Sequence, residues 1–249
     1  MRQFDVFVFE ETSPRFDQWK PSFEDSALGW FHDSDWNRPL QKMDSEWVVF
    51  THPAVKIDRD FLNNLAEVTE GFPMVDAFAP RVKYEGHFYG GILLNGGKGF
   101  TPIDEESKMR FVAAPTPLIG VFSSRIIQRT GLFDLDLPPE LRLLDYTLRM
   151  AHAGGKMFSV PYLVAQTSNK LSDREKTFLT GSFLQAKEAL RPEWQIIYKN
   201  LNVSSLIGFS LRHPGGFPLW FDTKKLKFKR DKATSLSKFN ETYRKEISL

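Results

Sequence analysis

The sequence predicts an α/β protein with a mixed sheet flanked by helices and a mainly helical C-terminal appendage. Three observations support this fold class. Short apolar runs recur through the first two thirds of the 249-residue chain. Several of these runs alternate with helical segments, as in sheets that are layered by helices. Beyond residue 167 the short runs give way to a longer helical pattern and then to a basic tail.

The expected strands are short and mostly apolar. Runs without an internal polar residue are typical of strands that are buried on both faces of a parallel sheet. In chain order the apolar runs cover residues 4–9, 27–31, 47–50, 75–79, 88–92, 111–114 and 118–122. Gly90-Gly91 and Asn95-Gly96-Gly97 are typical turn sequences.

The expected helices carry recognisable start signals. Residues 60–66 are predicted to be helical, with Asp58 or Asp60 near the N-cap. Ser123-Ser124 is a plausible cap for a short helix at 125–129. Two further helical segments are expected, at Pro39–Met43 and, after a capping box that starts at Ser172, from Glu175 to Leu190.

The composition excludes several classes of protein. A net charge of +2 does not indicate a polyanion-binding protein, and the absence of cysteine rules out disulfides and thiolate metal sites. The first residues lack the apolar core of a signal peptide, and no apolar run approaches 18 residues. We therefore expect a cytoplasmic protein.

Residues 131–162 are the most informative stretch. They read Gly131-Leu-Phe-Asp134, then Leu144-Asp145-Tyr-Thr-Leu-Arg149, then Gly154-Gly155-Lys-Met-Phe-Ser-Val-Pro161. The order predicts a turn, an acidic residue at the head of an amphipathic helix, a glycine stop and a short strand ending in proline. Each element alone is ordinary, since Asp145 could simply favour a helix N-terminus.

Taken in order, these motifs resemble the second half of the GT-A glycosyltransferase domain, family 2 type. That family reads roughly G-x-F-D, a gap, E-D-x-x-L-x-x-R, A-G-x-x, a strand and V-P. The resemblance covers about residues 4–167. It implies a GT-A-like domain over 1–167, a helical extension over 168–249, a nucleotide-sugar donor, and a glycan or lipid-linked saccharide acceptor. It also implies that Asp145 is the base that deprotonates the acceptor hydroxyl.

The N-terminal part departs from the family pattern. Family members usually open with a strand and place a second strand about thirty residues later, before the strand that here is 47–50. Either Asp5–Phe9 is the family's first strand with much deleted, or the usual first strand is missing. Glu10 stands where the family's strand-end acid contacts the nucleotide, so it is a candidate substrate-binding residue.

The metal-binding motif is also absent. After the 47–50 strand the family places D-x-D, whose carboxylates hold Mg²⁺ or Mn²⁺. This chain has Thr51-His52-Pro53 there, and it lacks the histidine that often follows the V-P strand. We therefore predict no divalent-metal cofactor at this strand end, and we take Thr51 and His52 as candidate substrate contacts.

Two functions stay open. The first is an inverting glycosyltransferase without a metal, in which Asp145 is the base and Arg149 either orients it or forms an ordinary i,i+4 pair. In that case a basic side chain such as Arg81 or Lys83, or a tail lysine, would stabilise the departing diphosphate. The second is a non-catalytic GT-A-like module that binds glycan or a partner protein.

The basic tail has its own alternatives. Lys224–Lys232 alternates lysine with Leu226 and Phe228. Its ordinary interpretation is a solvated tail. Peripheral contact with the inner face of a membrane is the next interpretation. No RNA-binding or helix-turn-helix signature is present, so nucleic acid is not an expected partner.

Overall fold

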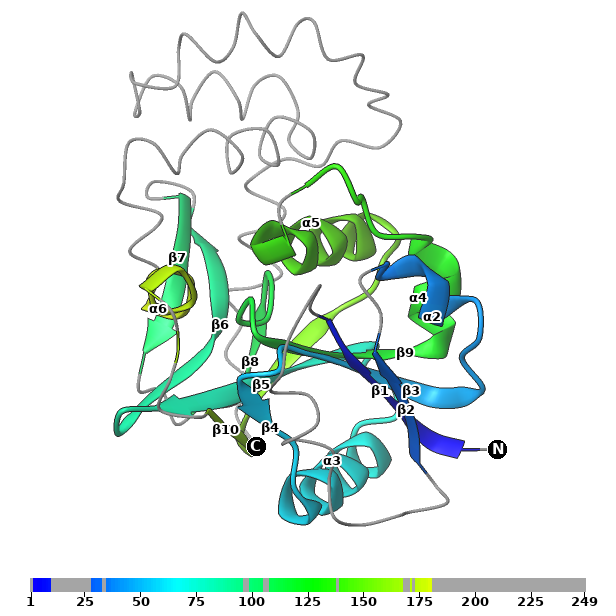
Figure 1. Cartoon of the computed structure of the whole chain (residues 1–249), viewed down its shortest axis with the longest axis horizontal. Coiled ribbons are helices and arrows are strands. Elements are labelled where there is room, and N and C mark those ends of the chain that lie inside the picture. The colour runs from blue at the N-terminus through cyan, green and yellow to red at the C-terminus, as the bar shows by residue number, and fades with distance from the viewer. Residues whose placement is uncertain are drawn as a thin grey trace, which may run out of the picture.

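The computed structural model describes residues 2–9, 28–32, 35–95, 99–104, 108–137, 139–167, 171 and 173–180. Over this part of the chain, ten strands form one mixed sheet whose main order is β2-β1-β3-β9-β5-β10-β4 (Figure 1). The β6–β7 hairpin continues from β5, and β8 pairs with β10. The strands are β1 Arg2–Val8, β2 Leu28–His32, β3 Ser45–Thr51, β4 Val55–Lys56, β5 Ala77–Tyr84, β6 His87–Asn95, β7 Gly99–Asp104, β8 Arg110–Val112, β9 Ile119–Ser123 and β10 Met157–Thr167.

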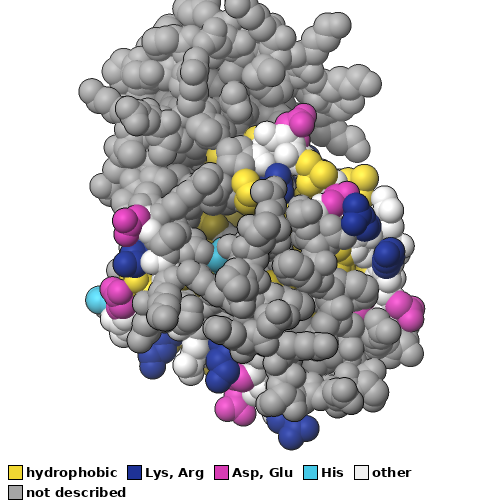
Figure 2. All heavy atoms as spheres, viewed as in Figure 1, with side chains coloured by type: hydrophobic (Ala, Val, Ile, Leu, Met, Phe, Trp, Pro, Cys, Tyr) yellow, Lys and Arg dark blue, Asp and Glu magenta, His cyan; other side chains and the backbone are white. Residues whose placement is uncertain are grey.

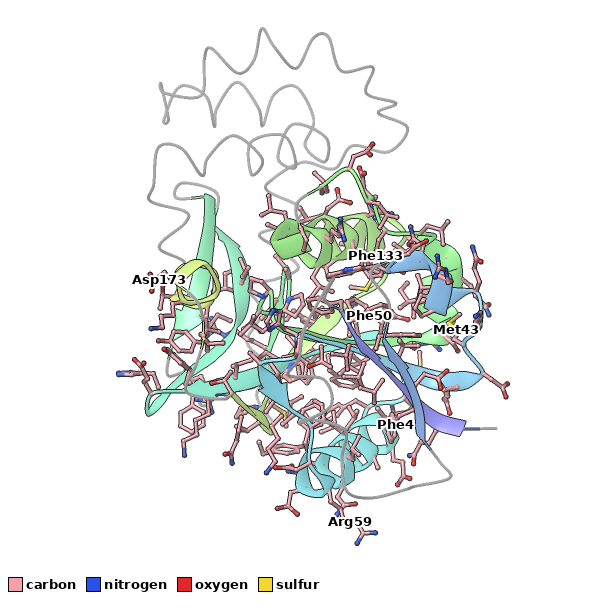
Figure 3. The ribbon with its side chains drawn as sticks, viewed as in Figure 1. Phe4, Met43, Phe50, Arg59, Phe133 and Asp173 are labelled. Carbon is pink, nitrogen blue, oxygen red and sulfur yellow. The ribbon has the colours of Figure 1, made fainter. Side chains whose placement is uncertain are left out.

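Helices lie on both faces of this sheet. They are α2 Asn37–Leu40, α3 Arg59–Gly71, α4 Ser124–Thr130, α5 Pro139–His152 and α6 Asp173–Thr180. Helix α3 covers one face, and α2, α4 and α5 cover the other (Figure 1). The two faces have separate apolar cores, and Figure 3 shows Phe4 on the α3 side and Phe50 and Phe133 on the α5 side. The predicted α/β class, with a mixed sheet flanked by helices, is confirmed.

The N-terminal strands answer the question that the sequence left open. β1 pairs in parallel with β2 on one side and with β3 on the other. The segment before β3 therefore holds two strands, and the first strand is not missing. Because β3 is antiparallel to β9, and β9 is antiparallel to β5, the strands β1, β2, β3, β5 and β10 all point the same way. Their carboxyl ends meet at one edge of the sheet, called the carboxyl edge below.

The predicted helix caps are present. The Asp58 side chain accepts a 2.9 Å hydrogen bond from the backbone N–H of Phe61 at the start of α3. Ser123 Oγ accepts one from the N–H of Ile126 at the start of α4. In both cases a side-chain oxygen satisfies a donor that the first helical turn leaves free, which is why local sequence predicts these boundaries well.

Two expected boundaries are wrong. β10 does not end at Pro161 but continues to Thr167, with a register shift between Ser159 and Val164, where the proline has no N–H to donate. The predicted strand over residues 88–92 is part of β6, so Gly90-Gly91 inside it is not a turn. Gly91 has φ +113°, and a Cβ there would come within 2.8 Å of the Ala114 carbonyl oxygen.

The C-terminal appendage is only partly described. Helix α6 covers the first turns of the helix expected from Glu175 to Leu190, and Leu179 is buried in the core on the α3 side. Ser172, the rest of that helix and the basic tail lie outside the described residues. The division into domains at residue 167 stays a prediction. None of the described helices is both long and apolar enough to cross a membrane.

Candidate functional site

The carboxyl edge brings the ends of β1 and β3 together. Val8 pairs with Thr51, and the N–H of Phe9 donates a 3.0 Å hydrogen bond to the Thr51 carbonyl oxygen. Open α/β sheets bind ligands at the carboxyl ends of their strands, so this is where a ligand site is expected. Glu10, the predicted contact that follows Phe9, lies outside the described residues.

Thr51 and His52 shape the turn at the end of β3. Thr51 is fully buried, and its Oγ1 donates to the His52 carbonyl oxygen at 3.3 Å. His52 Nδ1 accepts a 3.1 Å hydrogen bond from the N–H of Ala54, and the His52 N–H donates to the Leu118 carbonyl oxygen at 2.8 Å. One of the two imidazole nitrogens that could bind a metal is thus engaged by the backbone.

The end of β3 does not fit a divalent cation. Mg²⁺ and Mn²⁺ prefer several oxygen ligands, carboxylates above all. The Thr51 hydroxyl is buried against backbone, and the positions after β3 carry no carboxylate. Within the described ranges, no three His, Cys, Asp or Glu side chains are grouped so that they could hold a metal ion.

The turn at Gly131–Asp134 is held by hydrogen bonds from α2 and by ring packing on neighbouring aromatic side chains. The side chain of Asn37 in α2 forms two hydrogen bonds with the backbone of Phe133. Asn37 Nδ2 donates to the Phe133 carbonyl oxygen at 3.0 Å, and the Phe133 N–H donates to Asn37 Oδ1 at 2.7 Å. The Phe133 ring packs on Tyr146, Phe50 and Trp36, with ring centroids 4.2, 4.9 and 5.1 Å apart. Sequence reasoning found this turn but missed Asn37 and Trp36, which lie about a hundred residues earlier.

The motif predicts Asp145 at the head of its helix, but the structure does not place it there. Helix α5 begins at Pro139, so Asp145 lies in its middle. A proline is well tolerated in the first helical turn, because its missing N–H would have no partner there. The helix therefore starts earlier than the motif suggests, and the dipole argument for Asp145 does not apply.

The Asp145 carboxylate is buried in an ion pair. Its exposure is 0%, and its Oδ2 accepts a 2.7 Å hydrogen bond from Arg149 Nε, one turn further along α5. Arg149, whose side chain is 23% exposed, also donates from Nη1 to the Leu132 carbonyl oxygen at 2.9 Å. Arg149 thus ties the Gly131–Asp134 turn to α5, and Asp145 balances its charge. In this conformation Asp145 does not face solvent.

The neighbouring Tyr146 is also buried. Burial raises the pKa of its hydroxyl well above the ordinary value, against the opposing effect of the Arg149 charge. The phenol therefore stays protonated and adds an uncharged polar group beside the ion pair. Leu132 and Leu135 of the adjoining loop are exposed, and Figure 2 shows yellow hydrophobic side chains on the described surface in this region.

Comparison with known proteins places this arrangement in a fold family. No family model matches the chain, and no curated protein matches it by sequence. A solved structure of GalNAc-T7 with UDP, GalNAc and Mn²⁺ matches 96% of this chain with a TM-score of 0.55 at 11% identity. The chain has a GT-A-like fold. It spans 50% of the GalNAc-T7 chain.

Two further solved structures are similar to a lesser degree. The mannosyltransferase PcManGT from Pyrobaculum calidifontis, in complex with GDP-Man and Mn²⁺, has a TM-score of 0.49 at 14% identity, over 90% of this chain and 74% of that one. S. aureus TarS 1-349 in complex with UDP-GlcNAc has a TM-score of 0.47 at 12% identity, over 92% and 77%. The fold assignment rests on the likeness to GalNAc-T7, and it confirms the fold that the 131–162 motifs predicted.

Proposed function

We propose that this GT-A protein binds a nucleotide-sugar donor at the carboxyl edge, beside the ends of β1 and β3. It then transfers the sugar, with inversion, to a glycan or lipid-linked saccharide. The observation that carries this proposal is the Gly131–Asp134 turn, which packs through Phe133 onto Phe50 near the end of β3. Two segments far apart in sequence thus lie together in a fold of this type, at the edge where open α/β sheets bind ligands.

In this proposal Asp145 is the base. Inversion is assisted by a base that takes the proton of the acceptor hydroxyl while that oxygen bonds to the anomeric carbon and the sugar–phosphate bond breaks. The nucleoside diphosphate leaves with the bonding electrons. Because Asp145 is buried against Arg149, catalysis further requires the turn or α5 to move so that the carboxylate reaches the acceptor.

A second candidate is a non-catalytic module that binds glycan or a partner protein. Two observations favour it specifically. The carboxylate of Asp145 already has a structural task in holding Arg149, and the end of β3 lacks acidic ligands. A fold that has lost its chemistry would keep the packing of the turn and need not keep an accessible base.

Calorimetric titration of the full chain with UDP, GDP and several UDP- and GDP-sugars separates these functions. If the protein is a transferase, at least one donor should bind, and its nucleotide should be released during turnover. Asp145→Asn should lower the rate of that release about 100-fold or more per folded molecule. The module predicts no turnover with any donor. If no nucleotide or nucleotide sugar binds at millimolar concentration, the donor site proposed here is wrong.

Cellular location stays a prediction. The basic segment Lys224–Lys232, on which peripheral membrane contact depends, lies outside the described residues. Cosedimentation of the full chain and of a Lys224→Gln/Lys225→Gln variant with anionic vesicles would test that contact. Equal sedimentation of both proteins would contradict it.

A further inference from the structure

Arg81 of β5 lies level with the end of β3, although β5 itself continues to Tyr84. Val121 of β9 pairs with both Val49 of β3 and Phe78 of β5. His52 lies three residues after Val49, and Arg81 lies three residues after Phe78. His52 and Arg81 are therefore at the same level along the direction of the strands. With one strand between them, ordinary strand spacing separates their backbones by roughly 10 Å.

The side chain of Arg81 belongs to the α5 side of the sheet. Residues two apart on a strand share a face, and Ala77 and Ala79 of β5 lie in the core on that side. Arg81 and Lys83 therefore point the same way. The β6–β7 hairpin stands on the same side as α5 (Figure 1), and β5 leads directly into it. Arg81 thus lies at the base of the hairpin.

Among the residues that the structure describes, Arg81 is a cation without a countercharge. Its Nη1 donates a 3.2 Å hydrogen bond to the Pro161 carbonyl oxygen, and its guanidinium lies 4.4 Å from the centroid of the Phe88 ring. Its Nε–H is buried and has no hydrogen-bond partner. None of the carboxylates in the described ranges pairs with it. Desolvation by burial lowers its pKa, as expected for a cation without a neighbouring anion.

Lys83 brings a second positive charge to the same place. Its ammonium group is 5.7 Å from the centroid of the same Phe88 ring. Two like charges beside one ring repel each other, and a half-buried guanidinium with an unused N–H is costly to keep. Such an arrangement becomes favourable when an anion binds between the two cations, because a guanidinium forms strong charge-assisted hydrogen bonds with phosphate oxygens.

We infer that Arg81 and Lys83 form an anion site that takes a phosphate group of the substrate bound at the carboxyl edge. This inference rests on the proposed function, since it names the residues that hold the substrate's phosphate in the same site. The phosphate has two sources with the same chemistry: the diphosphate of the nucleotide-sugar donor, or the phosphate of a lipid-linked acceptor. Arg81 supplies the planar donors, and Lys83 adds charge from an exposed position.

The test is calorimetric titration of the full chain with inorganic pyrophosphate. Arg81→Gln should weaken binding about tenfold to a hundredfold, the range for a hydrogen bond to a charged group. Lys83→Gln, which removes an exposed charge, should weaken binding up to about fivefold. Arg59→Gln is the matched control. Arg59 is exposed at the start of α3, on the opposite side of the sheet (Figure 3), and the variant should bind like the wild type.

Two further arms identify the source of the phosphate. A donor diphosphate predicts that UDP or GDP binds more tightly than uridine or guanosine, and that Arg81→Gln removes the difference. If the phosphate belongs to the acceptor, farnesyl diphosphate should bind more tightly than farnesol, and Arg81→Gln should remove that difference. Should Arg81→Gln unfold, Arg81→Lys replaces it. That variant keeps the charge but loses the planar guanidinium. Its affinity for pyrophosphate should be lower than that of the wild type and higher than that of the double variant Lys83→Gln/Arg81→Lys.

The inference and the proposed function can fail separately. If UDP or GDP binds to the wild type, and Arg81→Gln binds both that nucleotide and pyrophosphate as tightly as the wild type does, the anion site is wrong and the donor site stands. If neither nucleotide binds but pyrophosphate binding depends on Arg81, the anion site stands and the donor site is wrong. Absence of any pyrophosphate binding to the wild type at millimolar concentration overturns the anion site.

Discussion

Asp145→Asn tests whether the buried ion pair of α5 holds the Gly131–Asp134 turn. The amide keeps the shape of the side chain and can still accept a hydrogen bond from Arg149, but the charge is lost. A hydrogen bond to a charged group contributes about 1.5–3 kcal/mol, and the fully buried limit for breaking an ion pair is about 3–5 kcal/mol. Because Arg149 is 23% exposed, the lower range applies.

The expected loss of stability is measurable. About 1.5–3 kcal/mol corresponds to a fall in Tm of roughly 3–12 °C for a chain of this size. Circular dichroism melting of the full chain gives Tm, and urea titration gives the free energy of unfolding. Asp136→Asn is the matched control: Asp136 is exposed in the adjoining loop, and its loss should change stability by less than about 0.5 kcal/mol.

A double-mutant cycle shows whether the two residues act together. Arg149→Met removes the cation and the hydrogen bond to the Leu132 carbonyl oxygen, and it takes the Arg149 charge away from the buried Asp145 carboxylate. We expect it to cost more than Asp145→Asn, about 3–5 kcal/mol. The double variant should cost less than the sum of the two, with a coupling of about 1–3 kcal/mol.

Two results would refute this reasoning. One is a Tm of Asp145→Asn equal to that of the wild type together with a large loss of turnover, which describes a base without a structural task. The other is additivity of the two substitutions within about 0.5 kcal/mol, which describes residues that do not interact. A loss of stability with activity per folded molecule intact supports the structural task and contradicts the base.

Three further expectations concern the turn, the hairpin and the strand end. Asn37→Ala removes both hydrogen bonds to the backbone of Phe133 and should cost about 2–4 kcal/mol in urea titration; a cost under about 0.5 kcal/mol would show that the rings alone hold the turn. Gly86→Ala, at φ +86° with open space around it, should cost about 1–2 kcal/mol. Gly91→Ala should cost more than Gly86→Ala because its Cβ also meets the Ala114 carbonyl oxygen at 2.8 Å, and equal melting temperatures would contradict this. Nucleotide binding should survive EDTA, because the described positions after β3 lack the carboxylates that hard cations need; loss on chelation with recovery in Mn²⁺ would contradict it.

The parts of the fold that sequence predicts well are those with local causes. Asp58 and Ser123 cap their helices through hydrogen bonds to residues three positions later, so the signal lies within one turn. The order of motifs over 131–162 predicted the fold family because a turn, a helix and a strand follow each other without long insertions. Pro161 led only to a wrong end for the last strand, because a register shift lets β10 continue past that proline.

The parts that sequence missed depend on distant partners. Gly91 looks like a turn residue, but its conformation goes with the close approach of Ala114 from the segment after β8. Asn37 carries no signal of its own, and its role appears only when Phe133 is beside it. Arg81 was one of several basic residues that could meet a diphosphate, and the sequence offered no way to choose. Arg81 is favoured by its register in the sheet and because none of the described carboxylates pairs with it.

The distribution of charge at the carboxyl edge connects these observations. In the family pattern, two carboxylates at the end of this strand hold a divalent cation, so the protein and the ion together are near neutral before the donor arrives. In this chain β3 ends at Thr51 and is followed by His52, and the cations Arg81 and Lys83 of β5 lie at a similar level in the sheet. Cations that none of the described carboxylates neutralises attract phosphate directly, so the site would need no metal ion to make it positive. The same charge arrangement serves either proposed function, since a glycan-binding module with a phosphate-bearing ligand would use it as well as a transferase. What separates the two is Asp145, because only the transferase requires that carboxylate to leave Arg149 and reach the substrate.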